Sequence, residues 1–95
     1  MSWKLEFDSG TKKDFSKIDH SDRKKILQSL KEFVDSFSDD FERSLMQTGH
    51  IKKLKGGTNN VYRLRLRTYR VIYEKQNDCL VIFVVRVGHR KDVYK

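Results

Sequence analysis

The chain has 95 residues, of which 37% are hydrophobic and 36% are charged, and its formal net charge is +8. This length allows one small domain, so residues 1–95 are predicted to form a single domain. No apolar run reaches the roughly 18 residues of a membrane span, the N-terminus lacks a signal-peptide apolar stretch, and the single cysteine, Cys79, cannot form an internal disulfide. We therefore expect a cytoplasmic protein without a membrane partner.

The positive charge is concentrated in the second half of the chain. Residues 1–50 carry 9 Lys and Arg against 10 Asp and Glu, whereas residues 51–95 carry 12 against 3. The corresponding net charges are −1 and +9. Such asymmetry is typical of a protein that binds an anionic partner, because the field is strongest where that partner sits.

The first half is predicted to contain one short strand and two helices. Alternating residues 3–7 form the strand, and residues 11–18 form a weak helix with few apolar contacts. Ser21 is a candidate N-cap for a stronger helix over residues 23–37. The apolar stripe of that helix is Ile26, Leu27, Leu30, Phe33, Val34 and Phe37.

The second half is predicted to be mainly strand. Residues 36–49 are polar and acidic and are interpreted as a helix end followed by a loop, and residues 56–60 form a turn. Three strands follow with links of one to three residues, which make neighbouring strands antiparallel; they cover about 61–67, 69–75 and 79–87. The predicted fold is α+β, a small antiparallel sheet in the order β-α-α-β-β-β with both N-terminal helices on one face.

Apolar and cationic residues alternate strictly in the strand over residues 61–67. Side chains of a strand point to opposite faces in turn, so one face carries Tyr62, Leu64 and Leu66 and the other carries Arg63, Arg65 and Arg67. The arginines would be spaced roughly 7 Å apart. This row of fixed cations predicts a surface for a polyanion.

Three further arginines, Arg70, Arg86 and Arg90, lie on or just after the later strands. Guanidinium groups bind phosphate oxygens in pairs and stabilise the extra charge of a phosphoryl transition state. His89 can carry a proton near neutral pH, and the Tyr94 hydroxyl can relay one or its ring can stack on a base. Both catalysis on a phosphodiester and simple nucleic-acid binding remain open on these residues.

No metal or other cofactor is predicted. The histidines His20, His50 and His89 are far apart in the sequence, and no Cys and His spacing is typical of a metal site.

Four segments give the chain a resemblance to the RelE/ParE toxin superfamily, and specifically to its RelE branch. They are Lys53–Gly56, Tyr62–Arg67, Tyr69–Tyr73 and Val87–Tyr94, in the β-α-α-β-β-β order described above. The resemblance implies a bacterial or archaeal toxin that enters the ribosomal A site and cuts mRNA without metal, by 2′-OH attack. It also implies an antitoxin partner, expected to be acidic, in addition to the ribosome with its 16S rRNA.

The resemblance also assigns residues. The catalytic set it implies is Arg63, Arg65, Arg70, Arg90 and Tyr94, and the residues expected to touch RNA or the ribosome are Lys52, Lys53, Lys55, Arg67 and Lys91. The best-described member has lysines where Arg63 and Arg65 stand, and arginine is a poor general base because its pKa exceeds about 12. We expect the arginines to act electrostatically, with His89 as a proton carrier and Tyr94 or solvent as alternatives.

Two other functions compete with this one. A ParE-like inhibitor of DNA gyrase would share the fold but would not need the arginine and tyrosine set. A non-catalytic module would bind RNA in a salt-sensitive way without forming products.

Overall fold

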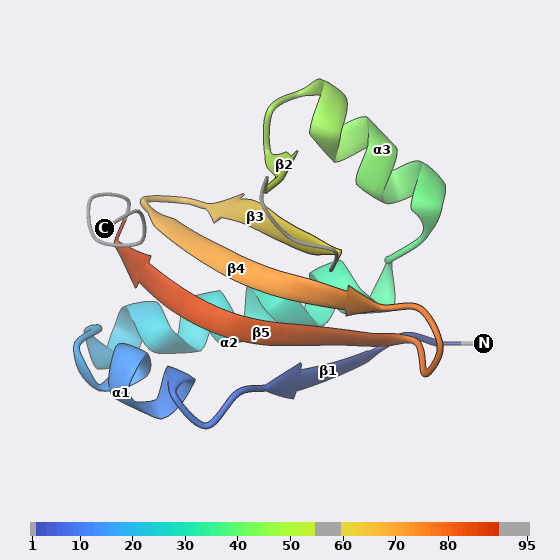
Figure 1. The fold of residues 1–95 in the computed structure, drawn as a ribbon. Helices are drawn as coiled ribbons and strands as arrows, with labels where there is room; N and C mark the ends of the chain where they lie inside the picture. The colour runs from blue at the N-terminus through green and yellow to red at the C-terminus, as the bar shows by residue number, and fades with distance from the viewer. Residues whose placement is uncertain (1, 55–59, 90–95) are drawn as a thin grey trace.

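A five-stranded sheet with the strand order β1-β5-β4-β3-β2 organises the structure, a computed structural model that describes residues 2–54 and 60–89 (Figure 1). The strands are β1 Lys4–Phe7, β2 Ile51–Lys53, β3 Val61–Leu66, β4 Tyr69–Gln76 and β5 Val81–His89. The helices are α1 Thr11–Ser16, α2 His20–Asp35 and α3 Asp39–Gln47. The α+β class is therefore confirmed.

The sheet is mixed and not wholly antiparallel as predicted. The β2–β3, β3–β4 and β4–β5 pairs are antiparallel, but β1 pairs with β5 in parallel, for example Leu5 with Ile82. A parallel pair needs a long crossover, which the helices and the three intervening strands supply here. Short-range turn signals report only the links between consecutive strands, so they could not reveal this pairing of the first strand with the last.

The helix boundaries differ from the expectation at both ends of α2. Asp19 and not Ser21 is the N-cap, and its carboxylate accepts a hydrogen bond from the Ser21 N–H at 3.1 Å. The helix buries Ile26, Leu30, Phe33 and Val34, whereas Leu27 is 38% exposed. The apolar stripe is thus narrower than the sequence pattern indicated.

Helix α3 occupies a segment that was predicted to be a helix end and loop. The Ser38 hydroxyl caps the helix by accepting a hydrogen bond from the Phe41 N–H at 3.0 Å. Three acidic residues in the first turn interact favourably with the positive end of the helix dipole. The cap and these acids are present in the sequence. Phe41 and Leu45 also lie one helical turn apart, so the sequence carried a short amphipathic pattern that the interpretation as a loop overlooked.

One face of the sheet carries the core. Figure 1 shows α2 running along this face. Phe33 of α2 contacts Tyr73 of β4 with ring centroids 5.7 Å apart and Phe41 of α3 at 6.0 Å, and Tyr62 of β3 stacks on Tyr73 at 5.4 Å. Among the described residues no helix combines the length and the apolarity needed to cross a membrane.

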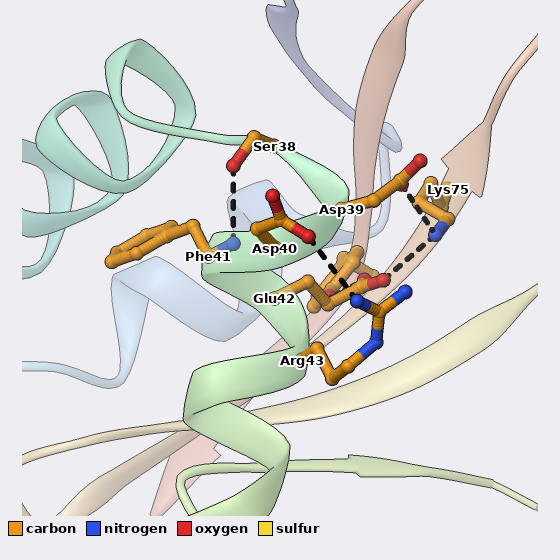
Figure 2. A network of polar contacts seen from close by, with 8 residues as sticks. Ser38, Asp39, Asp40, Phe41, Glu42, Arg43 and Lys75 are labelled. Carbon is orange, nitrogen blue, oxygen red and sulfur yellow. Dashed lines mark hydrogen bonds and ion pairs between the residues drawn. The ribbon is translucent and has the colours of Figure 1, made fainter.

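A buried ion pair attaches α3 to β4 (Figure 2). Glu42 accepts hydrogen bonds from the Tyr73 hydroxyl at 2.8 Å and from Lys75 Nζ at 2.7 Å, and Asp39 lies 3.6 Å from the same ammonium group. The side chains of Glu42 and Lys75 are only 6% and 10% exposed. Because these side chains are buried away from water, Tyr73 and Lys75 depend on the Glu42 carboxylate for their hydrogen bonds.

Replacing Glu42 by Ala is expected to lower the free energy of unfolding by about 3 kcal/mol, since it leaves the Lys75 ammonium buried without its carboxylate. Urea denaturation measures the change. Asp39→Ala is the matched control and should cost about 0.5 kcal/mol or less, because Asp39 is exposed. The double variant Glu42→Leu, Lys75→Met should recover most of the loss, and an equally unstable double variant would contradict this account.

The same network predicts a loss of stability at alkaline pH. Burial raises the pKa of the Tyr73 hydroxyl, and the Glu42 charge and hydrogen bond raise it further. Burial lowers the pKa of Lys75, but the Glu42 hydrogen bond and charge outweigh burial, so the pKa is raised. The folded state therefore holds these protons to higher pH than the unfolded chain, and the contribution is complete below about pH 10.

The urea midpoint is accordingly expected to fall as the pH rises above about 10, through the titration of the folded groups. Tyr73→Phe removes one of the two groups of this network whose pKa is raised by folding. The fall of the urea midpoint with pH should therefore be shallower in this variant. The opposite result, a midpoint that declines equally in both proteins, would show that Tyr73 is not coupled to Glu42.

Candidate nucleic-acid interface

The pairing register places four of the predicted arginines, Arg63, Arg65, Arg70 and Arg86, on the face of the sheet opposite the core. Directly paired residues of neighbouring strands point to the same face. Arg65 pairs with Arg70, which pairs with Gly88, and Lys52 pairs with Arg63, which pairs through Ile72 with Arg86. We call these five basic residues the cationic face: Lys52, Arg63, Arg65, Arg70 and Arg86.

A β-bulge decides which residues of β5 join this face. Tyr73 pairs with Val84 but Ile72 pairs with Arg86, so Val85 is an extra residue on β5. Without the bulge, Arg86 would face the core and Val87 would lie among the arginines, because one residue of slip exchanges the two faces. With it, Val87 is buried and Arg86 is on the cationic face.

Arg63 and Arg70 are buried, with only 7% and 9% of their surface exposed. Arg63 donates from Nη2 to the Gly49 carbonyl at 3.0 Å. Its Nε is buried and has no hydrogen-bond partner among the described residues. An unpaired buried N–H costs free energy, so this donor favours binding of a ligand that brings a hydrogen-bond acceptor.

Arg65 lies directly across from Arg70 in the β3–β4 pair. Cα atoms of such pairs are about 5 Å apart, and like charges in this position are unfavourable by themselves. Gly88, on the other side of Arg70, adds no side chain to the face. Two guanidinium groups on adjacent strands, both carried by a rigid sheet, form an arrangement that an anion stabilises.

Arg67 does not continue the row, contrary to the prediction. Strand β3 ends at Leu66, and Arg67 begins the two-residue turn with φ of 57°, a left-handed conformation that is uncommon for residues other than glycine. It lines a surface depression with Lys24 and Lys25 of α2. The alternation continued past the strand in the sequence, whereas the turn redirects this side chain.

His89 points to the opposite face of the sheet from Arg63, Arg65 and Arg70, although it lines the same surface pocket as Arg86 and Asp14. It pairs with Tyr69, whose buried ring lies 5.1 Å from the imidazole, and the Tyr69 hydroxyl donates to Asp22 of α2 at 2.8 Å. The hydrogen bond to Asp22, followed by burial, raises the pKa of Tyr69. His89 therefore lies on the side of the sheet that α2 covers, away from Arg70.

The sequence interpretation missed Asp14 of α1. Its carboxylate accepts the Val87 N–H at 3.0 Å and lies 3.5 Å from Arg86 Nε. This contact closes part of the outer edge of β5 beyond the end of β1. Nothing local in the sequence could reveal it, because the two partners are 73 residues apart.

The other predicted residues are placed as follows. Lys52 and Lys53 are exposed on the edge strand β2, with Lys52 opposite Arg63 and Lys53 opposite Tyr62. Within the described ranges, no group of three His, Cys, Asp or Glu side chains could hold a metal ion. Four predicted site residues lie outside the described residues: Lys55, Arg90, Lys91 and Tyr94.

Comparisons with known proteins identify relatives of this fold. The model of the family described as the ParE toxin of the type II toxin–antitoxin system parDE matches residues 5–94. RelE in the RelB–RelE complex from Methanococcus jannaschii is 30% identical, with a TM-score of 0.65 and 95% of each chain covered. The isolated RelE toxin of E. coli is 27% identical, with a TM-score of 0.66, and the match covers 98% of this chain and 92% of that one.

A third match, RelE in the archaeal RelE–RelB complex from Pyrococcus horikoshii OT3, is 19% identical with a TM-score of 0.70, covers 98% of this chain and 100% of that one, and shows the fold alone. A search of curated proteins returned no match. The match over residues 5–94 and the similarity to RelE agree with the resemblance in the strand motifs. The chain belongs to the RelE/ParE superfamily of toxins of type II toxin–antitoxin systems.

Proposed function

We propose that this toxin is a ribosome-dependent endoribonuclease that cuts mRNA in the A site and thereby inhibits translation. The observation that supports this is the juxtaposition of Arg63, Arg65 and Arg70 on one face of the sheet, with Arg65 directly opposite Arg70. A protein that acts only by binding gyrase has no need for this arrangement. The proposed site of action is the cytoplasm, where ribosomes translate.

The proposed reaction is an attack of the ribose 2′-oxygen on the adjacent phosphorus. The new P–O bond forms as the bond to the 5′-oxygen breaks, which leaves a 2′,3′-cyclic phosphate and a 5′-hydroxyl. Arginines of the cationic face stabilise the negative charge of the pentacoordinate transition state, and fixed donors of this kind each contribute several kcal/mol. Arg90 and Tyr94 belong to the proposed site by their sequence positions.

The proton of the 2′-hydroxyl needs an acceptor other than arginine. His89 lies beside Tyr69 on the face opposite Arg70, so the proposed mechanism does not use it as the proton carrier. Solvent or Tyr94 takes the proton in the proposed mechanism, and solvent protonates the leaving 5′-oxygen. The arginines then supply positioning and charge, which is the larger part of catalysis in phosphoryl transfer.

The proposed regulator is an acidic antitoxin. Several matched toxins were solved in complex with RelB, and the +9 charge of residues 51–95 would attract an acidic segment. We propose that Lys52, Lys53, Lys55 and Lys91 contact mRNA or ribosomal RNA. Arg67, on the α2 side of the sheet, is proposed to contact the ribosome and not the mRNA.

Arg70→Gln is expected to lower the single-turnover rate of mRNA cleavage on ribosomes by about 10²-fold, since it removes one charged donor from the transition state. Mapping the mRNA ends and testing them for cyclic phosphate measures the effect. Arg43→Gln on α3 is the matched control and should cleave normally, because Arg43 is exposed and pairs only with Asp40. Urea denaturation of each variant separates lost chemistry from lost folding.

His89→Gln is expected to leave the single-turnover rate within about twofold and to keep the shape of its pH profile between pH 6 and 8, where histidine titrates. The reason is its position beside Tyr69, on the opposite face from Arg70. A single-turnover rate that falls tenfold or more while the stability of the variant is unchanged would return His89 to the catalytic set.

Inhibition of DNA gyrase is the second candidate, and the ParE name of the matched family model favours it. It predicts gyrase-dependent DNA breaks and unchanged mRNA in cells that express the toxin. Codon-phased mRNA cuts without DNA breaks support the nuclease. Salt-sensitive RNA binding without either product would identify a binding module.

A further inference from the structure

Arg86 extends the candidate site toward α1. It lies two residues before Gly88 on β5, and Gly88 is directly opposite Arg70. Two residues along a strand and one strand across place the Arg70 and Arg86 backbones on the order of 8 Å apart. One extended RNA strand can present neighbouring phosphates over such a distance.

Asp14 orients this arginine through one edge of the guanidinium group. Its Oδ2 lies 3.5 Å from Arg86 Nε and also accepts the Val87 N–H at 3.0 Å, so the carboxylate is anchored to the backbone of β5. The Asp14 side chain is 14% exposed and that of Arg86 is 52% exposed. The acid is thus largely covered where it meets the strand, while the base remains accessible to a ligand.

No described residue forms a polar contact with the other edge of the Arg86 guanidinium. Its Nη1 and Nη2 atoms have no hydrogen-bond or ion-pair partner among residues 2–54 and 60–89. A guanidinium group has five N–H donors in a planar fork, so it can keep the Asp14 contact at Nε while two Nη donors bind a phosphate. Since a half-exposed ion pair at 3.5 Å is weak, Asp14 orients Arg86 without neutralising its attraction for an anion.

We propose that Arg86 binds the RNA phosphate next to the one held at Arg70, and that Asp14 is the positioning residue for Arg86. This inference rests on the proposed function and names a further substrate contact for it. RNA fits better than an acidic peptide because Arg86 extends a face that already carries cations on three strands. The register sets Lys52, Arg63 and Arg86 in line across the sheet, with Arg70 two residues to the side of that line. Binding of an acidic antitoxin segment is the alternative that the test must separate.

The test uses short single-stranded RNAs in which one linkage at a time is a neutral methylphosphonate. Affinity is measured on free RNA, and cleavage is measured on ribosomes programmed with the same substitutions. Neutralising a contacted linkage should weaken binding to the unmodified protein roughly tenfold. Arg86→Gln should bind natural RNA roughly tenfold more weakly and should no longer respond to one linkage, the neighbour of the scissile phosphate.

Two further variants complete the design. Asp14→Asn keeps an oxygen acceptor for the Val87 N–H but removes the charge beside Arg86, so it should weaken binding less than Arg86→Gln and at the same linkage only. Arg43→Gln, which also breaks an exposed arginine ion pair, should bind every RNA as the unmodified protein does. A general loss of folded protein would weaken binding to every RNA by the same factor. An effect confined to one linkage is therefore not caused by unfolding.

The inference is supported if Arg86→Gln makes the affinity insensitive to neutralisation of that one linkage. If the unmodified protein shows this linkage dependence but does not cut RNA, only the nuclease proposal falls. Normal cleavage with an Arg86→Gln variant that still responds to every linkage overturns the role of Arg86 alone. Weaker binding to the antitoxin, in place of a change at one RNA linkage, also overturns it. If the unmodified protein neither binds nor cuts RNA, both proposals fall.

Discussion

The pairing register of β3, β4 and β5 is the constraint on which the rest of the structure depends. It sets Arg65 opposite Arg70 and Gly88, and Arg63 in line with Ile72 and Arg86. A slip of one residue would bury the guanidinium groups in the core and expose the aromatic residues. Since burying charged groups without partners is far costlier than any surface contact, the core side of the sheet enforces the geometry of the cationic side.

Contacts on the core face therefore support a site that they do not touch. Stacked Tyr62 and Tyr73, with Phe33 against Tyr73, fix β3 and β4 against α2. Glu42 fixes β4 against α3, and the Tyr69 hydroxyl bound to Asp22 fixes the start of β4 against the start of α2. The tyrosine stack joins the two strands to each other, and the other contacts tie β4 to a helix, so rigidity at the proposed site comes from the opposite face.

The bulge in β5 sets which face of the sheet each residue at the end of this strand occupies. It directs Arg86 to the cationic face and Val87 to the core, and it leaves His89 beside Tyr69. The described part of the site is consequently rich in fixed positive charge. Fixed charges of this kind are suited to stabilising an anionic ligand.

The sequence alone was enough to predict the α+β class, the arginine alternation in β3, the short links of the meander and the family, because these follow from local periodicity and motifs. Only the tertiary structure decided the parallel pairing of β1 with β5, the burial of Glu42 of α3 against β4, the bulge that reorients Arg86 and the contact of Asp14 with Val87. It also placed His89 on the opposite face from Arg63, Arg65 and Arg70, and turned Arg67 toward Lys24 and Lys25. The physical reason is that each of these features depends on strand register or on partners distant in the chain, and neither leaves a periodic signal in nearby residues.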